Sequence, residues 1–165
     1  YLSGPIPNST GRFLVWYGNR SNCSVSPFAC LDQDVTSGFG PETMTITQLS
    51  TAGPYYYSVN NYSGESPISQ SGARVDVYIN NALTQSFFAP AGNGSTWDVF
   101  QLNGTQVTAI NTYGSVLGSR TPNVPGISAS RAPAMQSTTL IHHTDADLIE
   151  QVKRLHPKRS RRPNQ

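Results

Sequence analysis

The 165-residue sequence has little charge, few cysteines and no long apolar run. Asp, Glu, Lys and Arg make up 12% of the chain, about half of the ~25% that is usual in soluble globular proteins. No stretch approaches the ~18 apolar residues of a transmembrane helix, so the sequence predicts no membrane span. No histidine precedes His142, which excludes a Ser-His-Asp triad within residues 1–119. Since no other set of catalytic groups is evident, we expect a protein that is not an enzyme.

Charge and aromatic residues divide the chain near residue 118. Residues 1–119 hold three basic and six acidic residues, whereas residues 120–165 hold eight basic and three acidic ones. All 16 aromatic residues lie at or before Tyr113, and aromatic side chains contribute the most buried area to a core. We therefore predict a folded domain over residues 1–118, a Pro- and Ser-rich linker over 119–143, and a tail over 144–165.

The tail contains one predicted amphipathic helix and a basic run. An apolar stripe of helical spacing is formed by Leu148, Ile149, Val152 and Leu155, and such a short helix needs a surface on which to dock. We expect this helix to act in assembly, against its own domain or a neighbouring subunit. The basic run at residues 158–162 (KRSRR) has several possible interpretations: a solvated terminus, a processing site, or a segment that binds an anionic glycan. Binding to nucleic acid fits poorly with the rest of the chain.

Short strand patterns recur through the predicted domain. Alternating or β-branched and aromatic runs occupy residues 12–17, 43–49, 55–62, 73–79, 82–88, 96–102 and 105–112. Asn80-Asn81 is expected to form one tight turn, and Asn103-Gly104 has the composition of a type I′ hairpin turn. The fold class predicted is all-β: an antiparallel two-sheet β-sandwich of about seven strands, followed by the extended tail.

Six sequons and two cysteines indicate an extracellular or cell-surface location. The Asn-x-Ser/Thr sequons lie at Asn8, Asn19, Asn22, Asn61, Asn93 and Asn103. A turn-rich sequence also generates such triplets by composition alone, so the alternative of unmodified asparagines stays open. Cys23 and Cys30 enclose six residues; we predict a local disulfide, with two buried free thiols as the alternative.

Several segments resemble one bacterial family. Residues 31–43 (LDQDVTSGFGPET) resemble the LDxDxTxxxGPE signature of the YfaP-type extracellular or periplasmic β-sandwich domains. Further similarities, in the same order as in that family, occur at residues 4–19, 56–62, 71–78 and 97–102. The resemblance implies a first strand of the form D-L-D-x-H, of which this sequence has only the end, beside residues 2–5. We therefore expect a vacant strand position with an open edge, where a strand of another chain can add.

The acidic residues of the signature are the candidate metal ligands. Asp32, Asp34 and Glu42 offer the hard oxygen ligands that Ca²⁺ prefers. The alternative is that the two aspartates cap turns, with the glycines and proline between them and Glu42 shaping the loop. No cofactor is expected to be required, and Ca²⁺ is the one ion that the pattern favours.

Aromatic residues offer a second kind of site. Trp16, Tyr17, Tyr55 and Tyr57 are candidates for a platform on which sugar rings stack. Because alternate residues of a strand point to opposite faces, at least half of such residues are expected in the core.

Two functions therefore remain. The first is a structural or adhesive subunit: a glycosylated sandwich that assembles into an extracellular fibre, appendage or surface layer through strand or tail exchange between copies. The alternative is a carbohydrate-binding module, with or without Ca²⁺.

Overall fold

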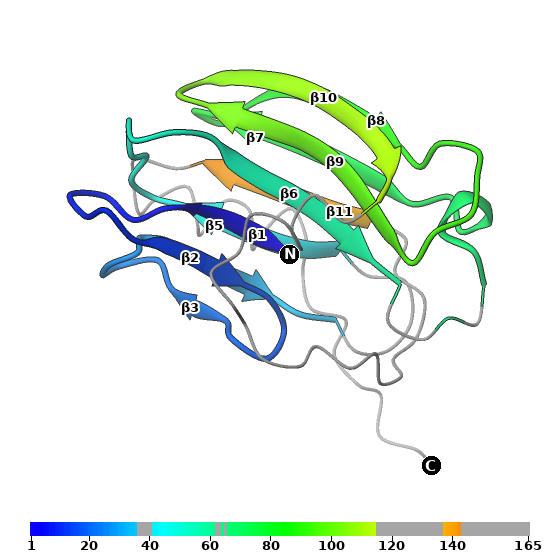
Figure 1. The fold of residues 1–165 in the computed structure, drawn as a ribbon, viewed down its shortest axis with the longest axis horizontal. Helices are drawn as coiled ribbons and strands as arrows, with labels where there is room; N and C mark the ends of the chain where they lie inside the picture. The colour runs from blue at the N-terminus through cyan, green and yellow to red at the C-terminus, as the bar shows by residue number, and fades with distance from the viewer. Residues whose placement is uncertain (36–40, 62–63, 65, 115–136, 143–165) are drawn as a thin grey trace, which may run out of the picture.

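Two β-sheets face each other in the computed structural model, which describes residues 1–35, 41–61, 64, 66–114 and 137–142 (Figure 1). The first sheet has five strands in the order β10-β9-β6-β1-β2, and the second has six in the order β3-β4-β5-β11-β7-β8. The strands are β1 (Leu2–Pro5), β2 (Arg12–Val15), β3 (Ser21–Asn22), β4 (Ala29–Gln33), β5 (Pro41–Ile46), β6 (Tyr55–Asn60), β7 (Arg74–Ile79), β8 (Ala82–Phe88), β9 (Thr96–Asn103), β10 (Gln106–Tyr113) and β11 (Ser137–His142).

The predicted all-β sandwich is confirmed. The part of the chain that the structure describes has more strands than the seven expected, because some strands have no strand-like sequence. β1 reads LSGP and β3 has only two residues, so neither shows a period-two pattern. The helix predicted around Leu148 lies outside the described residues.

Aromatic rings join the two sheets at the centre of the core. The ring of Phe100 on β9 stacks on Tyr57 of β6 with centroids 5.3 Å apart, and on Phe87 of β8 with centroids 5.5 Å apart. Phe87 belongs to the six-stranded sheet and the other two to the five-stranded sheet, so this stack spans the interface between the layers. Trp97 and Tyr55 are also fully buried.

Both predicted hairpins form, with one difference in turn chemistry. Asn80 and Asn81 both have positive φ between the paired residues Ile79 and Ala82, which is the type I′ geometry. At the other hairpin Asn103 pairs with Gln106, so the two turn residues are 104 and 105, and Gly104 alone has positive φ. The turn therefore lies one residue later than predicted and has the φ pattern of a type II′ turn.

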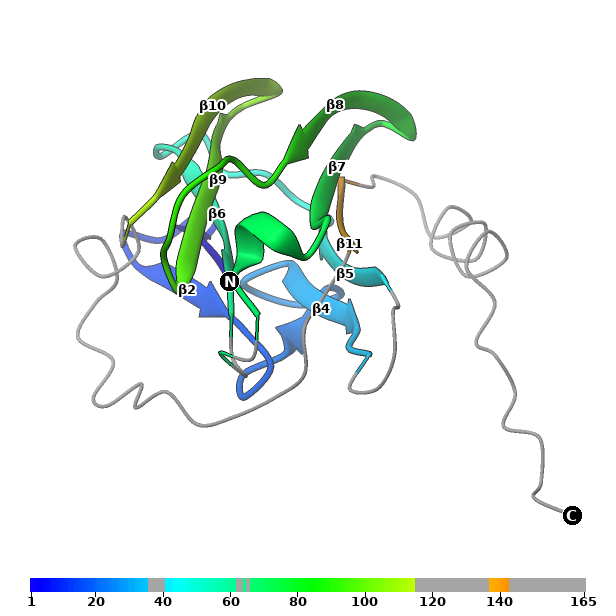
Figure 2. The same ribbon diagram turned by 90° about the vertical axis from the view of Figure 1, so that its right-hand side faces the viewer.

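β11 is the main difference from the sequence prediction. The linker was expected to run to residue 143, yet Ser137–His142 lies inside the six-stranded sheet, between β5 and β7 (Figure 2). It runs parallel to both neighbours, whereas all other strand pairs in the described part of the fold are antiparallel. A boundary at residue 118 therefore does not separate the sandwich from everything that follows.

The close approach of β1 to the core depends on Gly4. A Cβ at this position would lie 2.0 Å from Cδ1 of Tyr55. The ring of Tyr55 is buried, and its hydroxyl accepts a hydrogen bond from the backbone N–H of Ser50 at 2.7 Å.

We predict that Gly4→Ala lowers the free energy of unfolding by about 1–3 kcal/mol through overpacking. Urea denaturation measures this change. Gly11→Ala is the control, since its Cβ meets the flexible tip of Ile6 at 3.3 Å; equal losses in both variants would contradict the packing argument.

Candidate functional site

The central strand position of the six-stranded sheet is the most unusual feature of the fold. β5 and β7 do not pair with each other; each instead pairs with β11 along all six of its residues. Leu140 occupies the register position of both Met44 on β5 and Val77 on β7. We call the position between β5 and β7 the strand slot. Without an occupant, the sheet would separate into β3-β4-β5 and β7-β8.

Apolar core residues flank the strand slot on both sides. Met44 and Ile46 of β5 and Val75 and Val77 of β7 are buried, and all four belong to the hydrophobic core. Thr43 of β5 is also buried, and its Oγ1 has no hydrogen-bond partner among the side chains that the structure describes. The occupant of the slot therefore completes two backbone ladders beside the core.

Within the described residues, no strand position is vacant beside β1, where a vacant one was expected. β1 pairs with β2 on one side over four residues and with β6 on the other over two. The strand position that depends on a distant segment lies in the opposite sheet instead, in the strand slot.

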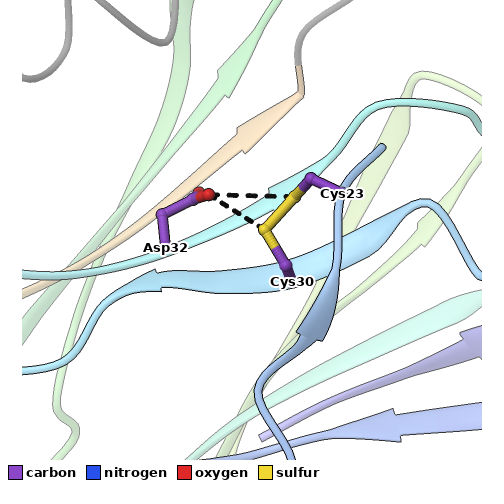
Figure 3. Close-up of side chains that lie close together, drawn as sticks. All are labelled: Cys23, Cys30 and Asp32. Carbon is purple, nitrogen blue, oxygen red and sulfur yellow. Dashed lines mark hydrogen bonds between the residues drawn. A yellow bond between two sulfur atoms is a disulfide. The ribbon is translucent and has the colours of Figure 1, made fainter. Parts of the chain in front are cut away.

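The predicted disulfide is confirmed: Cys23 and Cys30 are bonded to each other, which leaves no free cysteine. Oδ1 of Asp32 lies 2.9 Å from Sγ of Cys30 and 3.8 Å from Sγ of Cys23 (Figure 3). These three residues place their potential metal-ligand atoms within 4.8 Å of one another. Because bonded sulfurs are not thiolates, the group cannot act as a thiolate site in this state.

The other two predicted ligands come together. The carboxyl groups of Asp34 and Glu42 interact with each other, and Glu42 also interacts electrostatically with the guanidinium of Arg20 and the amino group of Tyr1. Burial raises the pKa of Glu42 to about 7; the Tyr1 amino group opposes this rise and the Asp34 carboxylate adds to it. Burial also lowers the pKa of the Tyr1 amino group to about 6. Asp32 contacts the disulfide, and a calcium site formed by all three carboxylates stays a prediction.

The predicted aromatic platform is wrong for two of its four residues. Tyr55 and Tyr57 are fully buried in the core, so they cannot stack on a ligand. Trp16 and Tyr17 lie at the turn that follows β2, where Tyr17 is 47% exposed. Their rings meet edge to face at 4.6 Å, and the ring of Tyr1 stacks on Trp16 with centroids 6.2 Å apart. We call these three residues the aromatic cluster.

The sequon asparagines differ in what their side chains bind. Asn8, Asn93 and Asn103 are exposed in loops or at a turn. The side-chain amides of Asn19 and Asn61 donate hydrogen bonds to backbone oxygens, at 2.9 Å to Leu14 and 2.7 Å to Ser66, and Oδ1 of Asn22 accepts one from the N–H of Ser24. Glycosylation at all six stays a prediction, and the first three are the sites at which a glycan would displace the least.

Comparisons with protein-family models, with curated proteins and with solved structures find no match to this chain. Within the described residues, no helix is long and apolar enough to cross a membrane. The predicted assembly residues Leu148, Ile149, Val152 and Leu155 lie outside the part of the chain that the structure describes.

The raised pKa of Glu42 predicts a definite pH dependence of stability. A carboxyl group that binds its proton more tightly when folded contributes stability that is full below pH ~4.5 and is lost as pH rises through ~7. The loss is at most about 3 kcal/mol. The lowered pKa of the Tyr1 amino group has the opposite effect: its contribution to stability increases as pH rises from about 6 to 8. The contribution of Glu42 is therefore measured as the difference in free energy of unfolding between wild type and Glu42→Gln.

The measurement is the free energy of unfolding in urea at intervals from pH 4 to 8. Glu42→Gln is expected to remove the decline. Asp34→Asn is expected to move it to lower pH, because Asp34 raises the pKa of Glu42. A decline that persists unchanged in Glu42→Gln would show that another group is responsible.

Proposed function

We propose that this chain is a structural subunit of an extracellular assembly, in which neighbouring copies exchange the strand that fills the slot between β5 and β7. The observation that supports this function best is the position of β11, a segment distant in sequence that completes the centre of the sheet. We further propose that the sandwich is of the YfaP type, on the motifs given above.

The strand slot must be filled for the sandwich to be stable. β11 pairs with six residues on each side, and an unpaired buried N–H or C=O costs about 1–3 kcal/mol. The slot also lies beside Met44, Ile46, Val75 and Val77, and full burial of such a side chain contributes about 1.5–3 kcal/mol. An empty slot is therefore strongly disfavoured, and the fold depends on a segment able to fill it.

The occupying segment is on a long tether. Twenty-three residues separate the end of β10 at Tyr113 from the start of β11 at Ser137. A connection of that length spans up to roughly 80 Å when extended, which exceeds the diameter of a domain of this size. The same segment can thus reach the slot of its own sandwich or that of a neighbour.

The direction of β11 favours a neighbour as donor. β5 and β7 run the same way, so an inserted strand is either parallel to both or antiparallel to both. Parallel pairing is slightly less stable per residue than antiparallel pairing, and β11 is parallel on both sides. A strand from a second copy can enter antiparallel and form the stronger ladders.

The extracellular location rests on two features of the sequence and structure. The disulfide Cys23–Cys30 is of a kind that persists in oxidising compartments. Exposed sequons at Asn8, Asn93 and Asn103 are positioned for glycans on the surface of such a subunit.

We predict that Leu140→Asp prevents assembly, because it puts a charged residue at the register position of Met44 and Val77, both of which are buried. Light scattering coupled to size-exclusion chromatography measures the assembly mass. Since this variant can also lose stability as a monomer, a synthetic peptide of residues 134–145 is added in trans. The peptide is expected to bind the variant and raise its midpoint of unfolding.

The control peptide has the same composition in scrambled order. Val25→Asp is the matched protein variant, with the same kind of substitution at an exposed apolar residue of the disulfide loop, outside the strand slot. If the native peptide bound no better than the scrambled one, the strand slot would not accept a strand in trans, and the proposed exchange would be wrong.

The aromatic cluster favours a second candidate, a carbohydrate-binding module. Tyr17 is 47% exposed, and its edge-to-face contact with Trp16 holds the ring at the surface. Aromatic rings of this kind present a flat apolar face. Sugar rings also have an apolar face, and this class of ligand fits the cluster.

We predict that Tyr17→Ala weakens binding to neutral oligosaccharides about tenfold, equivalent to ~1.4 kcal/mol. Isothermal titration with cellohexaose and chitohexaose measures the affinity. Val25→Ala is the control, because Val25 is also exposed but lies away from the aromatic cluster, inside the disulfide loop. Equal affinities in the two variants, or no binding by wild type, would exclude this second candidate.

A further inference from the structure

Among the strands that the structure describes, β8 has an outer edge with no strand paired to it. β8 is the last strand of the six-stranded sheet and pairs only with β7. Its seven residues, ALTQSFF, include no charge and no proline, the two features with which natural proteins most often guard an edge. One register irregularity between Val77 and Tyr78 in its ladder with β7 is the sole protective feature.

Exposed apolar side chains gather on the same strand. The described residues include four exposed large hydrophobic side chains, and two of them, Leu83 and Phe88, are on β8. They are 55% and 64% exposed. Leu83 pairs with Tyr78, and Phe88 pairs with Arg74. Directly paired residues share a face and the register irregularity separates the two pairs, so both side chains belong to the face away from the core.

The nearest charges on that face neutralise each other. Arg74 and Asp76 of β7 form an ion pair, and Asp76 also accepts a hydrogen bond from Ser86 of β8 at 2.6 Å. A partner with a strong charge of either sign would find no complement there. The β8 edge of a second copy would meet no electrostatic repulsion from this face and no charge that lacks a partner.

The other edges are less suited to pairing. β2 carries Arg12 at its start, and β3 has only two residues. β10 is long and uncharged, but it begins just after Asn103, a sequon residue at the hairpin turn. A glycan at that turn would obstruct approach to β10.

We propose that two copies of this chain associate through antiparallel pairing of their β8 edges, which joins their six-stranded sheets into one continuous sheet. This contact is separate from the strand slot and involves none of its residues. The edge is about 23 Å long, so the pair alone buries less surface than the ~1,200–2,000 Å² of a stable interface. The contact is therefore weak between free subunits and is strengthened by repetition when subunits are already linked in a row.

The test is sedimentation velocity of the full-length chain over a range of concentrations. Leu83→Lys with Phe88→Lys places like charges across the symmetric edge and is expected to raise the dissociation constant of the pair by about tenfold or more. Val25→Lys is the matched control, because Val25 is as exposed as Leu83, at 55%. Both variants should keep the wild-type unfolding midpoint, since the substituted side chains are at the surface.

Hydrogen exchange at each residue locates the contact independently of the strand slot. Amides of β8 are expected to become protected as the wild-type concentration rises, and to stay unprotected in the lysine variant. A wild type that remains monomeric at millimolar concentration would overturn the proposal, as would equal association of the two variants. Protection on β10 in place of β8 would also overturn it, by placing the contact on a different edge.

Discussion

The structure depends on one constraint: β5 and β7 run in the same direction with a single strand's width between them, and a third strand must fill that space. β11 does so along six residues on each side. It closes the sheet next to the buried residues Met44 and Val77. The fold and the proposed association therefore use the same backbone hydrogen bonds. Anything that supplies a strand to the slot stabilises the subunit by mass action, so stability and assembly are coupled.

Much of the sandwich could be predicted because its strands obey local rules. Alternation over residues 74–79 marks β7, and Asn80-Asn81 supplies the positive φ that a type I′ turn requires. β11 could not be predicted in the same way. Its sequence, STTLIH, has no aromatic residue and follows a Pro-rich stretch, so composition places it in a linker. β11 is a strand because β5 and β7 leave a strand position between them. The sequence of residues 137–142 alone does not indicate that position.

The candidate sites show the same limit. Asp34 and Glu42 meet as the acidic signature suggested, but Asp32 contacts the disulfide instead. Three consecutive tyrosines begin β6, and alternation predicts that at least half of such residues are buried. The structure buries all three, since the outer face of β6 is covered as well. The exposure of Tyr17 at the turn after β2 could not be told from sequence, because its neighbour Trp16 is of the same residue class and is only partly exposed.

The most direct test of strand exchange is to ask which chain fills each slot, and in which direction. β11 in its own sandwich pairs Ile141 with Tyr78. An antiparallel strand that keeps Thr139 opposite Asp76 would instead pair Ser137 with Tyr78. Cysteines are placed at Tyr78 and at one of the other two positions, and equal amounts of ¹⁴N- and ¹⁵N-labelled chains are assembled, oxidised and digested. Strand exchange predicts that the Tyr78→Cys, Ser137→Cys protein forms crosslinked peptides of mixed isotope mass. Crosslinks from Ile141→Cys alone, all of unmixed mass, would contradict it.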